Sequence, residues 1–202
     1  MALCRRPPIM PWTKNFDIDV TLDKAMRLFW SRGYDATSMT DLVRNMGINR
    51  GSLYDTFGDK RSLFIAALHR YDDKCRKSRL AALERELCPI AAIQGLFDHW
   101  IDLILDDPTR AGCFLTNTAL ELSTHDCEIE NIVAQSQKET EQFFYRLIKT
   151  GQRSGDIPHA LDARQTARVL LAELVGLLVL ARSRPERALL RSIANGATRR
   201  LR

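Results

Sequence analysis

Apolar residues recur three or four positions apart along most of this chain, and that spacing constrains the fold more than any other feature. A helix turns once every 3.6 residues, so the spacing predicts helices that each bury one face. No stretch of useful length alternates between apolar and polar residues, as a half-buried strand would. The sequence therefore predicts an all-α fold of about nine helices. The first two examples are the sets Leu22, Ala25, Met26 and Phe29, and Met39, Leu42, Val43 and Met46.

Length and composition limit the class of protein. The chain has 202 residues, of which 45% are hydrophobic and 27% are charged, and this is ordinary for a globular protein with a buried core. Its five cysteines form no C-x-x-C pair, which argues against a disulfide framework and indicates a reducing compartment.

Neither a membrane span nor a secretory signal is expected. The longest apolar run, residues 169–181, contains Glu173 and is shorter than the roughly 20 residues that cross a bilayer. No apolar segment of the kind found in signal peptides follows the basic start, so we expect a cytoplasmic protein. Met10 could be the natural initiator, which would make residues 1–9 an upstream extension.

Positive charge is concentrated near the start of the chain. Residues 1–80 contain 15 Lys and Arg against 9 Asp and Glu, whereas residues 81–202 contain 15 against 16. A basic surface on this third of the molecule would attract a polyanion such as DNA, although a basic surface without such a partner is an equally good interpretation of charge alone.

Two short helices joined by a turn are expected between residues 37 and 57. Thr37 is the expected N-cap of the first, Gly47 breaks the chain, and Asn49 is the expected N-cap of the second. Leu53 and Phe57 would hold the second helix inward and leave its other face free. Short helices joined by a glycine-containing turn and packed against a preceding helix form a helix-turn-helix, whose second helix enters the major groove of DNA.

The same region strongly resembles the DNA-binding domain of the tetracycline-repressor (TetR) family of bacterial transcription regulators. The resemblance covers roughly residues 16–68, and the stretch that carries it reads FDIDVTLDKAMRLFWSRGYDATSMTDLVRNMGINRGSLYDTFGDKRSLF. Its matching features are the apolar helix from Ala25 to Phe29, Gly33-Tyr34, Thr37-Ser38, Met46-Gly47-Ile48, Leu53-Tyr54, Phe57, Lys60 and Leu63-Phe64.

The resemblance implies a homodimer with three parts in each chain. Residues 1–15 would be a flexible basic arm, residues 16–62 the helix-turn-helix domain, and residues 63–202 a larger helical domain for effector binding and for dimerisation through the last two helices. It further implies a repressor that binds a palindromic operator in double-stranded DNA and is released by a small hydrophobic or electrophilic effector or by cysteine modification.

By match to the family motif, nine residues are expected to contact DNA. Tyr54 and Lys60 should meet phosphates, Thr37 and Ser38 should do so from a helix N-terminus, and Arg50 can pair with a guanine. The full set is Thr37, Ser38, Asn49, Arg50, Gly51, Ser52, Tyr54, Thr56 and Lys60. The preceding Arg5, Arg6 and Lys14 could enter the minor groove or could belong to a disordered tail.

In the remainder of the chain the expected helices begin near residues 89, 110, 126, 162 and 185, and a loop is expected at residues 151–158. An effector pocket is expected among Phe97, Trp100, Cys113, Phe114, Asn117, Phe143, Leu147 and Leu174, although the same aromatic residues could be plain core. The cluster Arg182, Arg184, Arg187 and Arg191 is interpreted as a solvated face.

Cys113 is a candidate redox sensor because it lies near a helix start, where the helix dipole favours the thiolate form. Some members of the family sense electrophiles or oxidants through a cysteine in a similar Gly-Cys context. Cys127 could resolve a sulfenate formed on Cys113. The competing interpretation is that Cys113 is a small buried hydrophobic residue.

Catalytic and metal-binding motifs are missing from the sequence. It contains no G-x-S-x-G, H-E-x-x-H, P-loop or G-x-G-x-x-G pattern, so we expect neither an enzyme nor a cofactor. The sequence His125-Asp126-Cys127 is too crowded for metal-ligand spacing, and no metal is expected. The alternatives are an activator or an effector-independent regulator of the same fold, or a helical ligand carrier or enzyme in which the N-terminal motif is incidental.

Overall fold

A computed structural model describes residues 16–121 and 126–202, and all regular secondary structure in these two ranges is helical. Helices α4, η1 and α5 follow one another without a break, and counting them as one gives nine helices in the described ranges. The all-α prediction is confirmed. The elements are α1 (Ile18–Arg32), α2 (Met39–Met46), α3 (Arg50–Phe57), α4 (Lys60–Tyr71), η1 (Asp72–Lys77), α5 (Ser78–Glu86), α6 (Pro89–Asp106), α7 (Phe114–Glu121), α8 (Cys127–Ser154), α9 (Ala163–Ser183) and α10 (Arg187–Arg199).

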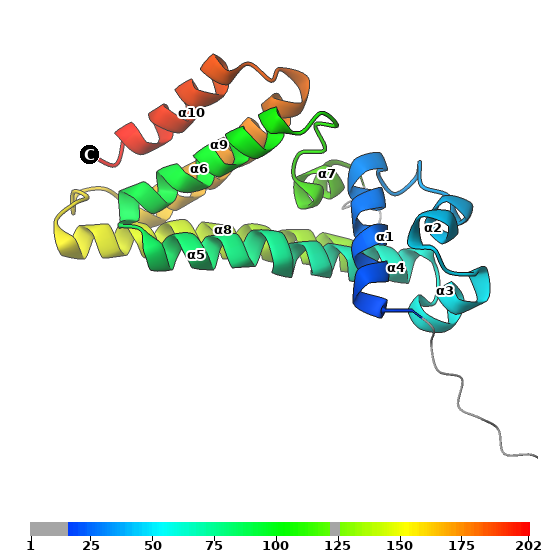
Figure 1. The fold of residues 1–202 in the computed structure, drawn as a ribbon. Coiled ribbons are helices and arrows are strands. Elements are labelled where there is room, and N and C mark those ends of the chain that lie inside the picture. Colours follow the sequence, from blue (N-terminus) through cyan, green and yellow to red (C-terminus); the bar gives the residue numbers. More distant parts are fainter. Residues whose placement is uncertain (1–15, 122–125) are drawn as a thin grey trace, which may run out of the picture.

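The helices form a small N-terminal unit and a longer C-terminal bundle (Figure 1). Helices α1 to α4 lie together at one end, with α1 packed along α4. The continuous helix α4–η1–α5 leads from this unit into the bundle, where α5 lies beside α8. Helices α6, α9 and α10 form the other side of the bundle, and α7 lies between them and α1. The expected boundary between residues 62 and 63 falls within α4.

Helix α2 begins one residue later than the sequence predicts. Its N-cap is Ser38, whose hydroxyl accepts a hydrogen bond from the Asp41 N–H while the Asp41 carboxylate accepts one from the Ser38 N–H. Thr37 was the predicted N-cap, and this is wrong: its side chain is buried and its hydroxyl donates to the Gly33 carbonyl at 2.7 Å. The reciprocal pair between residues three apart satisfies two otherwise unpaired N–H groups.

Helix α8 continues through part of the segment predicted to be a loop. Gly151 lies inside the helix, and a β-carbon there would be 2.6 Å from the Ile157 side chain, so glycine permits close packing instead of breaking the helix. Gln152 is also buried, and its amide donates to the Pro158 and Leu161 carbonyls. The helix ends at Gly155, which has a φ of 83°. The loop therefore starts four residues later than residue 151.

The remaining predicted helix positions agree with the structure within a few residues. Helix α6 starts at Pro89 as expected, and α9 and α10 correspond to the last two predicted helices. None of the helices in the described residues is long and apolar enough to cross a membrane. The predicted basic arm, with Arg5, Arg6 and Lys14, lies outside the described residues.

Candidate nucleic-acid interface and effector site

Helix α3 is short because both of its ends are fixed by the sequence. The Asn49 side chain accepts a hydrogen bond from the Ser52 N–H at 2.8 Å, as expected of an N-cap. Gly58, at a φ of 80°, ends the helix. Leu53 is fully buried and Phe57 packs against the core, so one face of α3 is anchored inward.

The opposite face of α3 is exposed and carries groups suited to DNA. Arg50, Gly51, Tyr54 and Asp55 are all exposed. The Arg50 guanidinium lies 5.7 Å from the centre of the Tyr54 ring, and its Nη2 donates to the Tyr54 hydroxyl at 3.4 Å. The two side chains therefore contact each other on the exposed face of α3. Asp55 would be repelled by phosphates unless it accepts from a cytosine amino group.

Thr56 does not present its hydroxyl on this face. Its Oγ1 is buried and has no hydrogen-bond partner among the described residues. Thr56 was expected to contact DNA, and its hydroxyl lies inside the fold rather than on the exposed surface. The Ser52 N–H is used by the Asn49 cap, while the Ser52 side chain is half-buried beside it.

The N-terminus of α2 offers a second contact surface, but through residues that differ in part from those expected. Thr37 cannot contact a phosphate, because its hydroxyl and its N–H are both bonded to carbonyls within the fold. The Ser38 hydroxyl is exposed and paired with Asp41. In the first turn, the N–H groups of Met39 and Thr40 have no intrahelical acceptor and are suited to an anion. The sequence analysis missed Thr40, which the spacing of Ser38 and Asp41 could have indicated.

Lys60 is the first residue of α4 and follows the end of α3 by three residues. Its ammonium is 4.2 Å from the centre of the Tyr34 ring, an attractive cation–π contact that holds the side chain in place. Asp59 caps the same helix and accepts from the Ser62 N–H at 2.7 Å. Hydrogen bonds from Ser62 lower the pKa of Asp59.

Two ion-pair clusters fix the N-terminal unit in place. Arg61 donates to Asp126 at 2.8 Å and to Glu128 at 2.9 Å, which joins the start of α4 to the start of α8. The hydrogen bond from Arg61 lowers the pKa of Asp126 to about 2. Within the unit, the hydrogen bond from Arg70 lowers the pKa of Asp23 to about 2.

An aromatic cluster joins α1 and α4 to α7. The Trp30 indole N–H donates to the Gly112 carbonyl at 2.8 Å, across the boundary between the two units. Phe114 contacts the rings of Phe64 and Tyr71 edge-on, at centroid distances of 5.5 Å and 5.7 Å. The segment around Gly112 is therefore in direct contact with α1 and α4, which in turn pack against α2 and α3.

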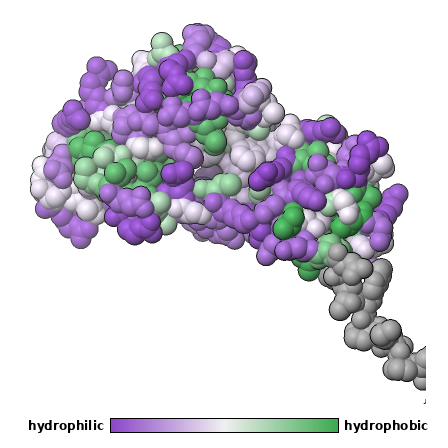
Figure 2. All heavy atoms as spheres, in the orientation of Figure 1, coloured by the Kyte–Doolittle hydropathy of each residue, from purple (hydrophilic) through white to green (hydrophobic). Residues whose placement is uncertain are grey.

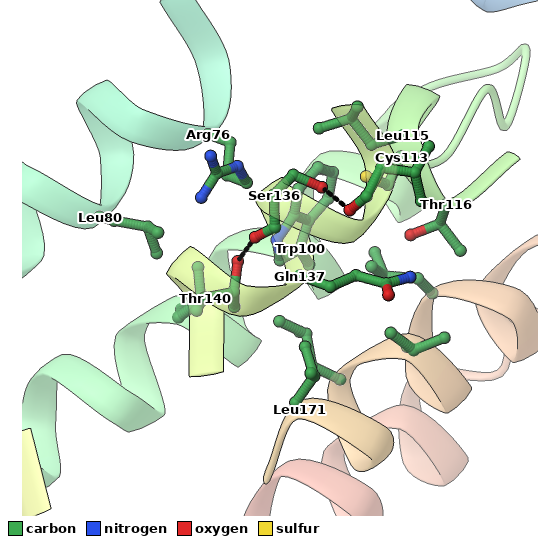
Figure 3. Close-up of a pocket in the computed structure, with 15 residues that line it drawn as sticks. Arg76, Leu80, Trp100, Cys113, Leu115, Thr116, Ser136, Gln137, Thr140 and Leu171 are labelled. Carbon is green, nitrogen blue, oxygen red and sulfur yellow. Dashed lines mark hydrogen bonds between the residues drawn. The ribbon is translucent and has the colours of Figure 1, made fainter. Parts of the chain in front are cut away.

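A partly open space, here called the inner cavity, lies between α6, α8 and α9 beside η1, and has a volume of about 50 Å³. Figure 3 shows Cys113 and Trp100 on its wall, as the sequence predicts, and Leu174 is a third predicted residue that lines it. Among its polar residues are Arg76 and Thr140, which the sequence analysis missed because nothing marks them apart from surface residues.

The other predicted pocket residues lie elsewhere. Phe97, Phe143 and Leu147 are buried in the hydrophobic core and do not line the inner cavity. Phe114 belongs to the aromatic cluster, and the Asn117 side chain binds the Ala111 carbonyl at 2.7 Å and Arg182 at 2.8 Å. Helical spacing alone did not distinguish these core positions from the lining of a cavity.

Cys113 is buried immediately before α7, and Cys127 is exposed at the first position of α8. Desolvation by burial raises the pKa of Cys75, a residue of η1, with a smaller electrostatic contribution from Cys113. Burial raises the pKa of the Tyr71 phenol well above its usual range, with further contributions from Cys113 and Cys75. The sequence analysis missed Cys75 because it lacks a marked local context.

The C-terminal arginines lie on a solvated face, as expected, and several of them form surface ion pairs there. Arg187 donates to Asp102 at 2.9 Å, and Arg191 donates to Asp98, so both tie α10 to α6. Arg184 pairs with Glu186. Within the described ranges, no group of three or more His, Cys, Asp or Glu residues could hold a metal ion.

Comparisons with known proteins cover both parts of the chain. Residues 22–67 match the family described as "Bacterial regulatory proteins, tetR family", and residues 89–196 match "Tetracyclin repressor-like, C-terminal domain". The HTH-type transcriptional repressor ComR of Escherichia coli (strain K12) is 34% identical over 189 residues, which cover 93% of this chain and 90% of that protein. The uncharacterized HTH-type transcriptional regulator YezE of Bacillus subtilis (strain 168) is 30% identical over 170 residues, which cover 84% of this chain and 88% of that protein.

A solved structure with DNA is also similar. It contains a cysteine-substituted variant of CifR, a TetR family transcriptional regulator, in complex with 26-base-pair operator DNA. That chain has a TM-score of 0.84 and 26% sequence identity, covering 95% of this chain and 100% of its own.

Proposed function

Since the chain belongs to the TetR family of DNA-binding transcriptional regulators, we propose that it represses transcription by binding a palindromic operator as a homodimer. The observation that carries this proposal is the exposed face of α3, anchored by Leu53 and presenting Arg50 and Tyr54 outward. A recognition helix reads base edges with its N-terminal residues, and Arg50 is the first residue of α3.

The proposed DNA contacts fall into two classes. Arg50, Gly51 and Ser52 in the first turn of α3 would approach the base edges, together with the Asn49 backbone at its cap. Tyr54, Lys60 and Ser38 would contact the phosphate backbone, and the free N–H groups at the start of α2 would assist Ser38. Figure 2 shows hydrophilic residues interspersed with hydrophobic ones on the visible face of this unit.

Operator selection from random double-stranded DNA tests the proposal. We expect a palindromic sequence, bound with an affinity whose logarithm falls with the logarithm of salt concentration by about 0.9 for each phosphate neutralised. An affinity for DNA that does not respond to salt, or no enrichment of any sequence, would contradict it. A ligand carrier with an incidental helix-turn-helix would give the second result.

We place the dimer interface on the outer faces of α9 and α10. Val169 and Val179 are exposed apolar residues on α9, at 36% and 38% of their full accessible area. Gly176 and Gly196 point away from the fold, since a β-carbon at either would meet nothing within 4 Å. Small and apolar outer faces allow two helix pairs to approach closely and bury apolar area.

Effector binding in the C-terminal domain would act on DNA binding through the segment at Gly112. The inner cavity is lined by Cys113, the next residue, and Gly112 accepts the hydrogen bond from Trp30 of α1. In this division, residues 16–62 read DNA and residues 63–202 sense and dimerise, with α4 shared between them. A change of a few ångströms in the spacing of two recognition helices would remove one of them from register. We propose that the protein acts in the cytoplasm, where a bacterial regulator would meet its operator DNA.

Cysteine modification is a second route of release, favoured by the thiols of Cys113 and Cys75. A peroxide would oxidise the Cys113 thiol to a sulfenic acid and be reduced to water, and condensation with the Cys75 thiol would form a disulfide and release a second water. We expect Cys113→Ser to abolish release from the operator by peroxide, and Cys75→Ser to stop disulfide formation. Cys127→Ser tests the alternative pairing, in which Cys127 resolves the sulfenate on Cys113. Disulfide formation should persist in this variant. Release that persists without Cys113 would make this residue a core residue only.

A further inference from the structure

The inner cavity shares a wall with a larger groove on the outside of the molecule. Arg76, Leu96 and Trp100 line both spaces, and the groove has a volume of about 470 Å³. The inner cavity alone, at about 50 Å³, is smaller than the roughly 300 Å³ or more of ordinary ligand pockets. Since three side chains separate the two spaces, a change of rotamer at Trp100 or Arg76 would join them into one site of ordinary size.

Arg76 provides this wall with an unused hydrogen-bond donor. Its side chain is only 10% exposed, and Nη2 donates to Asp72 at 2.9 Å and also to Glu139. Nη1 is buried and has no hydrogen-bond partner among the described residues. Leaving a buried charged donor without an acceptor is costly, so a ligand oxygen that reaches Nη1 would be bound with good affinity.

The charges around Arg76 favour a neutral acceptor over an anion. Arg76 and Lys77 face three carboxylates, Asp72, Asp73 and Glu139, so the two cations are already fully paired. A carboxylate added here would be a buried charge in excess, which carries a large desolvation cost. In the groove, Lys74 is paired with Asp23, and Arg79 is exposed, where water and salt screen it.

The rest of the inner cavity is mostly apolar. Leu80, Leu171 and Leu178 contribute to its wall, and Figure 3 shows Arg76 and Leu80 on one side with Leu171 opposite. The hydroxyls of Ser136 and Thr140 are bonded to backbone carbonyls of their own helix. Their O–H groups are therefore already used as donors within the helix and do not donate to a ligand.

We propose that the joined space binds an uncharged, apolar molecule with a carbonyl oxygen, and that this oxygen accepts a hydrogen bond from Arg76 Nη1. This ligand class deepens the proposed effector response and rests on it. Arg76 lies in η1, a π-helical segment between α4, which packs on α1, and α5. Such segments are frequent at functional sites, and a ligand at Arg76 would act directly on the helix that carries the DNA-binding unit.

Three small probes of matched size test the ligand class without DNA, so that failure of ligand binding and failure of operator binding are seen separately. The probes are acetophenone, ethylbenzene and benzoate, titrated calorimetrically into the full-length protein. We expect acetophenone to bind about tenfold more tightly than ethylbenzene, as one hydrogen bond to a charged donor would give. We expect benzoate to bind more weakly than acetophenone.

Arg76→Lys then tests the assigned donor, because lysine keeps the positive charge near Asp72 and Glu139 but lacks Nη1. The preference for acetophenone over ethylbenzene should fall to about twofold or less, against about tenfold in the unmodified protein. Arg146→Lys, in a surface pair with Glu84, is the matched control and should keep the full preference. Circular dichroism establishes that each variant is folded.

The carbonyl stretching frequency of bound acetophenone gives a measurement that needs no variant. A hydrogen bond from Arg76 should lower this frequency relative to that in hexane. Equal affinities for acetophenone and ethylbenzene, tightest binding by benzoate, no binding by any probe, an unshifted carbonyl band or a full preference in folded Arg76→Lys would each overturn the proposal.

Discussion

Arg50 and Lys60 are assigned different kinds of DNA contact, and single substitutions distinguish them. Arg50→Ala should cost about 1–3 kcal/mol on the selected operator and relax the base preference at one position. Lys60→Ala should weaken binding to all sequences similarly and reduce the salt slope by about 1. Fluorescence anisotropy measures the affinity of each variant for the operator and for single-base variants of it. Equal loss of specificity in the two variants would contradict the assignment.

Thr37 stabilises the N-terminal unit and is not expected to contact DNA. Thr37→Val removes the hydrogen bond to the Gly33 carbonyl and should lower the free energy of unfolding by about 1 kcal/mol. Operator affinity and its salt slope should not change in the folded variant. Denaturant unfolding and DNA titration check the two statements. A salt slope smaller by about 1 would restore Thr37 as a phosphate contact.

At the residue scale, the sequence predicted the buried anchors of α3 and its N-cap because their positions follow from helical spacing and capping chemistry. It did not distinguish Thr37 from Ser38, since both can cap a helix and only the packing of α1 against α2 determines which is buried. The orientation of Thr56 was not predicted for a similar reason: the direction of its hydroxyl depends on neighbours that are distant in sequence.

Helix α4 and helix α8 are joined by a pair whose strength depends on pH. The Arg61 hydrogen bond lowers the pKa of Asp126 from its ordinary 3.8 to about 2. A lowered carboxylate pKa contributes stability that is complete above pH 3.8 and is lost as pH falls through about 2. Asp126→Asn keeps an N-cap residue at the start of α8 but removes the charge.

We therefore expect the difference in unfolding free energy between the unmodified protein and Asp126→Asn to shrink as pH falls from 5 toward 2. Urea unfolding at several pH values measures it. Asp162→Asn is the comparison variant. Asp162 caps α9 by accepting hydrogen bonds from backbone N–H groups, and among the described residues it makes no pair with an arginine of the N-terminal unit. A difference that stays constant across this range would mean that Arg61 and Asp126 do not interact appreciably in solution.

At the scale of elements, the sequence predicted the number and order of helices because each has its own apolar stripe. The predicted start of the loop after α8 was wrong, because the helix continues through Gly151 to Ser154. Only the fold reveals that Ile157 packs against this glycine. The wall shared by the inner cavity and the groove could not be predicted from the sequence either. It depends on how Trp100 and Arg76, which belong to different helices, are arranged in the fold.

The whole molecule is proposed to act as a dimer of 23.1 kDa chains through α9 and α10. Val179→Arg places a charge on the outer face of α9 and should convert the dimer to monomers, because burying an unpaired charge is costly. Leu87→Arg is the matched control, since Leu87 is also an exposed apolar residue but lies at the end of α5. Light scattering after size-exclusion chromatography measures the mass. A dimer that persists in folded Val179→Arg would place the interface elsewhere.

Family membership confirms the prediction of a DNA-binding regulator over the enzyme and carrier alternatives. The helix-turn-helix made this assignment accessible from sequence, because many residues at fixed offsets coincide. The effector region offered no comparable pattern. Its lining comes from helices far apart in the chain, and only three of the predicted pocket residues, Trp100, Cys113 and Leu174, meet at the inner cavity.

The spacing of half-sites tests the central claim, that two copies of α3 enter successive major grooves on one face of a duplex. The selected operator is compared with a version carrying five extra base pairs between its halves, about half a helical turn. The account predicts that this insertion lowers the affinity of the dimer to that for a single half-site. Undiminished affinity for the lengthened operator would contradict it, because the second recognition helix would then face away from its half-site.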